Sequence, residues 1–383
     1  MLLAHCGQAR FVWNLAVEQG SWWRAGRKSA PGYLEQCRQL TAARAEFPWL
    51  AEGSQTVQQQ ALRDFSQAMT NFFNGTHGRP AWRKAGRDEG FRVVGKCGQQ
   101  WGVRRVNRWW GEVRVPKVGW IRFRWTRALP DGVKSYRVTR DRAGRWHVAF
   151  AATPSPILAP NNDTVVGIDR GIAVSAALST GELLTVPGLT PGEARRLRRL
   201  ERRLARGQRG SSRRRRVKLA VAQMKVRGRD RRKDWAEKLS TRLARDFDVI
   251  RVEDLNIRGM TRSARGTKKQ PGRNVAAKAG LNKGILDAGW GLLERRLQEK
   301  APGRIEKVQP AYTSQRCSAC GHTAAESRES QALFRCVACG YACNADVNAA
   351  RNIAAGRAVT ARGGDREAGP ANREPHLLHL VPV

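Results

Sequence analysis

The chain has 383 residues, and 71 Lys and Arg against 32 Asp and Glu give it a formal net charge of +39. With 41% hydrophobic residues, among them 13 Trp and 10 Phe, it has enough apolar material for folded cores, and its length predicts two or three domains. This balance excludes an intrinsically disordered tail protein, a secreted disulfide scaffold and a hydrolase of ordinary charge that acts on acidic substrates. Because so basic a chain would repel itself unless a polyanion neutralised it, the composition favours DNA or RNA as the partner.

The sequence carries no targeting signal that we recognise. No run approaches the ~18 apolar residues of a membrane span, and the opening MLLAHCGQARFVWN lacks the pattern of a signal peptide. We therefore expect a cytoplasmic, nucleoid-associated protein. An anionic membrane surface is a weaker alternative partner, because the basic stretches lack a bulky apolar face to insert.

The first part of the chain, residues 1–90, is predicted to be helical, with helices over 8–48 and 54–73. Ser54 is a candidate N-cap, and apolar residues from Val57 to Phe72 recur every three or four positions. A stretch rich in Gly and Arg, residues 75–90, closes this helical region.

From residue 91 the spacing of the apolar residues changes, and they recur at every second position. Ile121 and Phe123 alternate with arginines, and Trp146, Val148 and Phe150 alternate with other residues. This pattern predicts a small antiparallel barrel or sheet in the β-rich region 91–153. Its basic face could follow a phosphate backbone, although solvated arginines on an ordinary sheet fit the pattern equally well.

A proline-bearing linker, 154–160, precedes a second pattern. Residues 164–169 read as a buried strand that ends in an acid, and 171–179 and 182–186 as two strands joined by a turn at Thr180–Gly181. Residues 195–233 then hold 19 Lys and Arg against two acids, a net charge of +17. A leucine stripe predicts that this run forms a long basic helix pair.

Further along, Trp235 to Phe247 indicate another helix, and Val249–Val252 a strand that ends in Glu253 and Asp254. Residues 258–280, rich in Gly, Lys and Arg and without periodicity, predict a mobile loop. Helices are expected again at 285–297 and 345–354, and the tail 357–383 is expected to be disordered.

Four cysteines, Cys317, Cys320, Cys336 and Cys339, follow the pattern C-x2-C-x15-C-x2-C. Each pair can place two thiolates on one ion, and Gly321 and Gly340 suit the knuckle turns. Four sulfurs leave no open coordination position, so the spacing predicts a structural zinc ribbon over 311–340 rather than redox pairs or inert thiols. Cys343 lies outside the spacing, and we interpret it as an unligated thiol.

Three acids lie at the ends of predicted elements. Asp169 and Glu253 end apolar strands, and Asp346 falls in the first turn of a helix. Taken singly, each could be a cap or turn residue. Together, three such carboxylates could hold two Mg²⁺ ions ~3.5–4 Å apart for phosphodiester chemistry.

The sequence segments that contain these three acids resemble those of a known protein family. The segments VVGIDRGIAVSAALSTGE, DVIRVEDLNIRGM and YTSQRCSACGH…FRCVACGYACNADVNAARNI occur in this order. They closely resemble the TnpB/OrfB proteins of bacterial insertion sequences, relatives of the type V CRISPR effectors. GQARFVWNLAV, QQQALRDFSQAMTNFF and RVPKVGWIRFRW resemble the family's helical and wedge regions, so the resemblance covers most of the chain.

The resemblance implies a multidomain α+β protein with a RuvC-like nuclease domain of ribonuclease H fold. A helical recognition-like region and a wedge-like β-barrel would precede the nuclease domain over 161–310, which resumes at 341–356 after the zinc ribbon. Asp169, Glu253 and Asp346 would be catalytic and bind Mg²⁺ or Mn²⁺, whereas Asp254 matches an acid not usually given that role.

Family members bind a structured RNA from the transposon end and cut DNA beside a short transposon-adjacent motif. By analogy, the guide would pair with DNA while the protein recognises backbone and shape. The residues that we expect to contact nucleic acid lie in 195–233 and 258–280: Arg195, Arg196, Arg199, Arg202, Arg203, Arg213, Arg214, Arg215, Arg216, Lys218, Lys268 and Lys269.

One feature departs from the family. Its members usually begin with a β-strand ahead of the first helix, whereas this chain opens almost directly in the helix. We expect either a sheet in 91–151 with an exposed edge or a start codon upstream. The sequence leaves open three alternatives to an RNA-guided endonuclease: a cleavage-inactive RNA-guided DNA-binding protein, a true transposase and a compact CRISPR effector.

Overall fold

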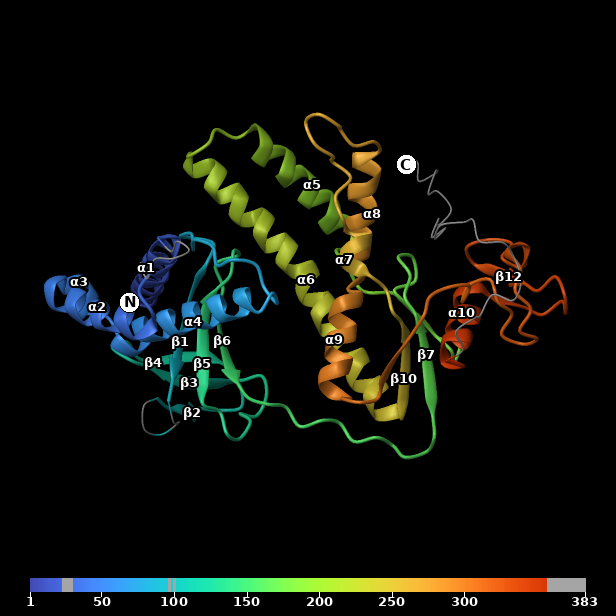
Figure 1. The fold of residues 1–383 in the computed structure, drawn as a ribbon, viewed down its shortest axis with the longest axis horizontal. Helices are drawn as coiled ribbons and strands as arrows, with labels where there is room; N and C mark the ends of the chain where they lie inside the picture. Colours follow the sequence, from blue (N-terminus) through green and yellow to red (C-terminus); the bar gives the residue numbers. More distant parts are fainter. Residues whose placement is uncertain (23–29, 96–97, 99–100, 357–383) are drawn as a thin grey trace. The chain divides into compact units, whose positions relative to one another are not determined.

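The computed structural model describes residues 1–22, 30–95, 98 and 101–356. The predicted tail over 357–383 lies outside these residues. The chain divides into two compact units, which are coloured along the sequence in Figure 1. The first comprises Met1–Ser155 and Pro187–Asp234, and the second comprises Pro156–Val186 and Trp235–Val383.

The first unit opens with four helices, which are α1 (Leu2–Ser21), α2 (Tyr33–Glu46), α3 (Pro48–Ala51) and α4 (Gln55–Phe73). The single helix predicted over 8–48 is therefore wrong: Gly32 caps α2, and Pro48 occupies the first turn of α3. Proline is tolerated there because its missing N–H would have no helical partner. The predicted cap at Ser54 is confirmed, since its side chain accepts a hydrogen bond from the Val57 amide.

The β-rich region contains six strands, which are β1 (Glu89–Val94), β2 (Val103–Arg105), β3 (Trp110–Val115), β4 (Gly119–Arg124), β5 (Ser135–Arg140) and β6 (Trp146–Ala151). They pair antiparallel, as their alternation predicts. Among the described residues they form two separate sheets, β1-β5-β6 and β2-β3-β4, and close no barrel. One core joins both sheets to the helices, with Trp101, Tyr136 and Phe65 buried in it.

The basic run forms the predicted helix pair, α5 (Pro191–Arg206) and α6 (Ser212–Asp246). The separate helix predicted from Trp235 is instead the last part of α6. No proline interrupts residues 212–246, and Gly228 inside the helix is buried against Leu189. A glycine inside a helix costs only roughly 0.5–1 kcal/mol relative to alanine, so the helix continues through it.

The second unit is built on a five-stranded sheet of β7 (Val165–Asp169), β8 (Ala176–Leu178), β9 (Leu183–Leu184), β10 (Val249–Glu253) and β11 (Ile305–Val308). The strand order is β11-β10-β7-β8-β9, in which β11, β10 and β7 are parallel and the other two antiparallel. Val166, Ile168 and Ile250 are fully buried in a core with Leu243 and Leu297. This burial explains the nearly continuous apolar run of the predicted strand.

The remaining elements of this unit are α7 (Ile257–Met260), α8 (Val275–Ala288), α9 (Trp290–Lys300), a 3₁₀ turn η1 (Ala325–Ser327), β12 (Leu333–Arg335), β13 (Ala342–Asn344) and α10 (Ala345–Ala354). The predicted loop over 258–280 is shorter than expected, because α7 and α8 occupy its two ends. Gly289, at φ +73°, separates α8 from α9 within the helix predicted over 285–297. No helix in the described part of the chain is long and apolar enough to cross a membrane.

Candidate carboxylate site and cysteine cluster

Two of the three predicted acids lie at the same edge of the sheet. Strands β7 and β10 run parallel side by side, with Ile168 opposite Val252, so Asp169 and Glu253 follow at their carboxyl ends (Figure 1). Asp346 lies in the first turn of α10, where the Asn344 side chain accepts hydrogen bonds from the Asp346 and Val347 amides. Parallel strands deliver side chains from distant parts of a chain to one edge, which is where sites form in such sheets.

Gly167 lets α10 lie directly on β7. A Cβ atom at this position would fall 2.0 Å from the Ala350 carbonyl oxygen and 2.4 Å from the Ala354 amide nitrogen. The helix presents small residues here, and its buried face includes Ala349 and Ala350. This backbone-to-backbone packing brings Asp346 to the sheet edge that carries Asp169 and Glu253.

The three carboxylates act on one another electrostatically. Burial, followed by the charges of Glu253 and Asp346, raises the pKa of Asp169 to about 8. Burial also raises the pKa of Asp346 above its usual range. Among the described residues, however, these carboxylates do not form a group whose ligand atoms all lie within 4.8 Å of one another. The structure thus brings the predicted acids into one site, while their role in catalysis stays a prediction.

A cation that the sequence reasoning missed faces this site. Arg328 lies between the two cysteine pairs, and its Nη2 is 3.8 Å from Asp346 Oδ1. Its charge lowers the pKa values of Asp169 and Asp346 against the effect of burial. Nothing in the sequence separates Arg328 from the many other arginines, because its partners are distant in the chain.

Glu253 is held by buried neighbours. It is 8% exposed, and its Oε1 accepts a hydrogen bond of 2.8 Å from the Thr313 hydroxyl. The buried guanidinium of Arg170 donates to the Glu253 carbonyl oxygen and, at 2.8 Å, to Glu294. Asp254 differs: its side chain is 60% exposed and pairs with Lys307 at 3.1 Å. The two adjacent acids therefore have opposite surroundings.

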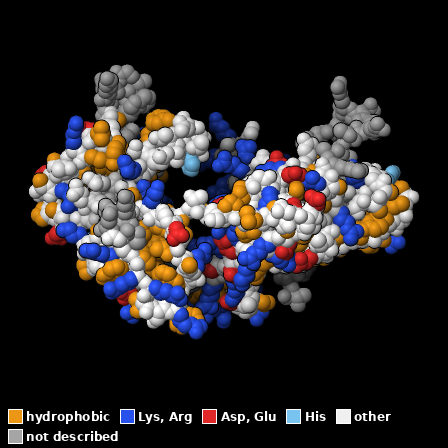
Figure 2. All heavy atoms as spheres, turned by 90° about the horizontal axis from the view of Figure 1, so that it is seen from below, with side chains coloured by type: hydrophobic (Ala, Val, Ile, Leu, Met, Phe, Trp, Pro, Cys, Tyr) orange, Lys and Arg blue, Asp and Glu red, His pale blue; other side chains and the backbone are white. Residues whose placement is uncertain are grey.

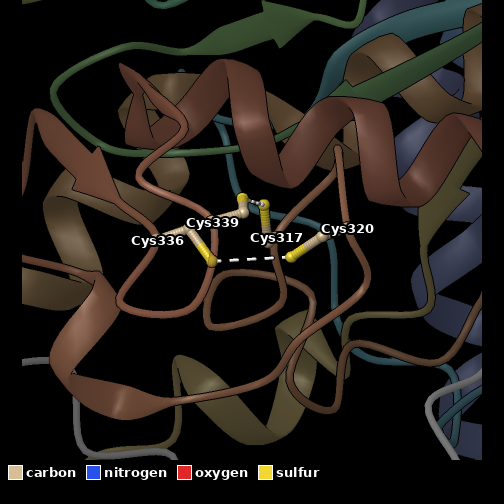
Figure 3. A group of neighbouring side chains, drawn as sticks. All are labelled: Cys317, Cys320, Cys336 and Cys339. Atoms are coloured by element: carbon tan, nitrogen blue, oxygen red, sulfur yellow. Dashed lines mark hydrogen bonds between the residues drawn. The ribbon is translucent and has the colours of Figure 1, made fainter.

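The four predicted cysteines converge at a second site (Figure 3). Their sulfur atoms all lie within 4.8 Å of one another, with 3.8 Å between Cys317 and Cys339 and 3.6 Å between Cys320 and Cys336. A tetrahedral zinc with Zn–S bonds of ~2.3 Å requires sulfur atoms about 3.8 Å apart. Within the described part of the chain, no other group of His, Cys, Asp and Glu meets this closely.

The backbone around both cysteine pairs repeats the same geometry. The amide of Gly321 donates to the Cys317 carbonyl at 3.0 Å, and that of Gly340 to the Cys336 carbonyl at 2.9 Å. Both glycines have positive φ, +80° and +70°, a conformation that other residues seldom adopt. Their predicted place in the knuckle turns is confirmed. Cys343 lies on β13 opposite Phe334 and outside the cluster.

The residues predicted to contact nucleic acid are exposed, with one exception. Helix α5 buries none of its residues, and Arg213, Arg215, Arg216 and Lys218 are exposed on α6. Arg214 is half-buried and donates to the Gly207 carbonyl at 2.8 Å and to that of Leu204, which fixes the turn between the helices. Lys268 and Lys269 are exposed in a turn closed by the bridge between Gly266 and Pro271.

Aromatic and basic side chains also gather on the sheet β2-β3-β4. Arg104 lies over the Trp120 ring at 4.4 Å, and Arg124 over Trp109 at 5.4 Å. A hollow of about 480 Å³ beside them is lined in part by Arg105, Arg108 and Trp125. Lys and Arg side chains lie among hydrophobic ones on the face drawn in Figure 2. The sheet β2-β3-β4 therefore combines the positive charge and the aromatic rings that proteins use to bind nucleic acids.

Comparisons with known proteins identify the family. A family model described as "Probable transposase" matches residues 148–264, and one described as "Cas12f1-like, TNB domain" matches residues 290–353. The chain is 37% identical to "Putative RNA-guided DNA endonuclease InsQ" of Escherichia coli K12, over 96% of this chain and 92% of that protein. It is 31% identical to a "Putative RNA-guided DNA endonuclease" of Streptomyces pristinaespiralis, over 93% of this chain and 86% of that protein.

A solved structure shares the fold. The protein in "Cryo-EM structure of the Cas12f1-sgRNA-target DNA complex" aligns with a TM-score of 0.51 at 13% identity, over 92% of this chain and 81% of that chain. The resemblance read from the three acid-bearing segments is thus confirmed. The chain belongs to the TnpB/OrfB family of transposon-associated RNA-guided DNA endonucleases.

Proposed function

We propose that this protein is a transposon-associated, RNA-guided DNA endonuclease that cleaves phosphodiester bonds at Asp169, Glu253 and Asp346. The observation that supports the proposal is that Glu253 and Asp346 both act electrostatically on the buried Asp169, although the three acids come from two parallel strand ends and a helix far apart in sequence. The family indicates the reaction, and the proposal assigns that reaction to these three acids.

The carboxylates fit divalent cations. Oxygen ligands are those that Mg²⁺ and Mn²⁺ prefer. Burial, and then the charges of Glu253 and Asp346, raise the pKa of Asp169 to about 8, and a bound cation would favour its ionised form. When bound, the ions would activate water and stabilise the leaving oxygen of the phosphodiester. Arg328 adds a fixed positive charge beside Asp346 that offsets part of the mutual repulsion.

The four cysteines would hold a structural zinc. The distances between their sulfur atoms match those of a tetrahedral zinc site, and four thiolate ligands leave no coordination position for water. The ion would fix the ribbon over 311–340 beside α10 and so support the carboxylate site without entering the chemistry.

We further propose the finer organisation implied by the family. The second unit carries a RuvC-like domain of ribonuclease H fold, and the parallel strands β11, β10 and β7 form one side of its sheet. Residues 1–90 and 91–153 form the recognition-like and wedge-like regions, and the exposed arginines of α5 and α6 bind a guide RNA from the transposon end and its DNA target. The protein acts in the cytoplasm, on DNA of the nucleoid.

Reprogramming tests this function. The protein is expressed with the RNA encoded at its own transposon end, and the purified complex is given a plasmid library with a target beside randomised sequence. We expect cutting in the presence of Mg²⁺ that follows the guide when its targeting segment is exchanged. A complex that binds the RNA and the matched DNA but leaves the plasmid intact with Mg²⁺ and Mn²⁺ would contradict the proposal and favour a cleavage-inactive binding protein.

A further inference from the structure

Thr313 makes a direct contact with one of the candidate catalytic acids. Its hydroxyl lies 2.8 Å from Glu253 Oε1 and 3.1 Å from the Pro310 carbonyl oxygen, and Thr313 is 3% exposed. A hydroxyl has one hydrogen to donate, and a carboxylate is the stronger acceptor. The shorter contact to Glu253 is therefore the donated one, and water has little access to replace it.

Helix α10 holds the backbone that carries this hydroxyl. The Asn352 side chain donates to the Thr313 carbonyl at 2.9 Å and to the Arg316 carbonyl at 2.7 Å. Asn348 donates to the same Arg316 carbonyl at 2.7 Å and accepts from the Ser318 amide at 2.9 Å. Both asparagines are buried. The helix that bears Asp346 is therefore hydrogen-bonded to the backbone from Thr313 into the first cysteine knuckle.

The turn before Thr313 is also constrained. Tyr312 has a φ of +62°, and its carbonyl accepts hydrogen bonds of 3.0 Å from the Gln315 and Arg316 amides. A left-handed conformation is unfavourable for a residue other than glycine, and it persists only where the surroundings determine it. The local fold thus gives Thr313 a fixed direction.

We infer that Thr313 is a positioning residue for Glu253, and that the first cysteine knuckle and α10 together hold it in place. Its hydroxyl fixes the direction of the Glu253 carboxylate through Oε1, and so the orientation in which this side chain would bind a metal ion. The cysteine cluster and the carboxylate site are then connected through the five residues from Thr313 to Cys317. The catalytic consequence rests on the function proposed above.

The test compares Thr313→Val, which keeps the shape and removes the hydroxyl, with Thr313→Ser, which keeps the hydroxyl. Thr323→Val, at an exposed site in the same knuckle, is the matched control. Loss of a residue that orients a metal ligand typically costs about 10–100-fold in metal affinity or activity. We expect Thr313→Val to weaken Mn²⁺ binding to the complex by that factor and to raise the Mn²⁺ concentration for half-maximal cleavage equally. Thr313→Ser and Thr323→Val should behave as wild type.

A double-mutant cycle separates positioning from general destabilisation. If Thr313 acts through Glu253, Thr313→Val will not weaken Mn²⁺ binding further in a Glu253→Gln background. If it acts through the fold of the ribbon, the two effects will add, and this result would overturn the inference, as would wild-type Mn²⁺ binding by Thr313→Val. Because Mn²⁺ binding is measured without cleavage, the inference is decided even if the wild-type complex proves unable to cut.

Discussion

A glycine without a Cβ atom sets the distance between the strand that carries Asp169 and the helix that carries Asp346. At Gly167 the nearest atoms to an added methyl group belong to the α10 backbone, which has no rotamer to change. The whole helix would have to move, and Asp346 with it. The apolar pattern of the strand does not predict that a glycine is required at position 167, because the residues that it contacts lie about half a chain away.

Gly167→Ala is therefore expected to destabilise the second unit by about 1–3 kcal/mol, as overpacking does. Gly280→Ala is the control of opposite sign: Gly280 is exposed within α8, with no atom within 4 Å of its added Cβ. Replacing a helical glycine by alanine stabilises by roughly 0.5–1 kcal/mol. Thermal melting and hydrogen exchange of α10 measure both variants. An unchanged melting temperature in Gly167→Ala would show that the helix is not seated as described.

The individual residues of the site differ in how far the sequence could predict them. The four cysteines are specified by local spacing, because each pair closes its own turn. The three acids needed the family resemblance, since an acid at a strand end has several uses. Thr313, Arg170 and Arg328 could not be predicted at all. Their contacts join residues 60 and 83 positions apart in the first two cases, a separation that no local period encodes.

The cysteine ribbon makes a prediction about a whole element. Cys336→Ser removes one of the four converging thiolates and should abolish stoichiometric zinc, whereas Cys343→Ser, seven positions along on β13, should retain one zinc per chain. Zinc content by elemental analysis and exchange of the ribbon amides give the result. Loss of zinc in Cys343→Ser, or its retention in Cys336→Ser, would contradict the assignment of the ligands.

Helix α5 is held at its N-terminus by charge. Thr190 caps it, and Arg231 of α6 pairs with Glu193 through two contacts, of 2.5 Å and 3.0 Å. The Arg231 side chain, then the Thr190 amide, lowers the pKa of Glu193 to about 2. A carboxylate with a lowered folded-state pKa stabilises the fold above its ordinary pKa, and that stabilisation is lost as the pH falls through the lower value.

The contact between α5 and α6 should thus weaken as the pH falls from about 4.5 toward 2. Hydrogen exchange of the α5 amides, corrected for the intrinsic pH effect, measures this. In Glu193→Gln the α5 amides should exchange faster at neutral pH and lose this pH dependence. Equal protection of α5 in wild type and variant at neutral pH would show that the ion pair does not hold the helix.

At the scale of elements, periodicity predicted where helices and strands occur better than where they end. The leucine stripe correctly indicated a basic helix pair, but the break expected before Trp235 is absent because α6 continues unbroken. Conversely, α8 and α9 are separated at Gly289 by a positive φ that the apolar pattern does not register. The first residues of the predicted loop over 258–280 belong instead to α7, because Ile257 and Met260 pack on Ile285 and Trp290.

For the whole molecule, the charge of +39 predicts steep salt dependence of RNA binding. Each phosphate contact contributes about 0.7–0.9 to the slope of log affinity against log salt. Replacing the exposed α5 arginines Arg195, Arg196, Arg199, Arg202 and Arg203 by Gln should lower the slope as well as the affinity. Filter binding between low and physiological salt gives both. A weaker affinity with an unchanged slope would mean that these arginines contact no phosphate.

The central claim is that one carboxylate site cuts DNA, and single-turnover cleavage of a guide-matched plasmid tests it most directly. Asp169→Ala, Glu253→Ala and Asp346→Ala are compared with Asp254→Asn, because the Asp254 side chain is exposed and pairs with Lys307. We predict that each of the first three variants binds guide RNA and target DNA but cuts neither strand in Mg²⁺ or Mn²⁺, whereas Asp254→Asn cuts as wild type. Full cleavage by Asp169→Ala would contradict the account.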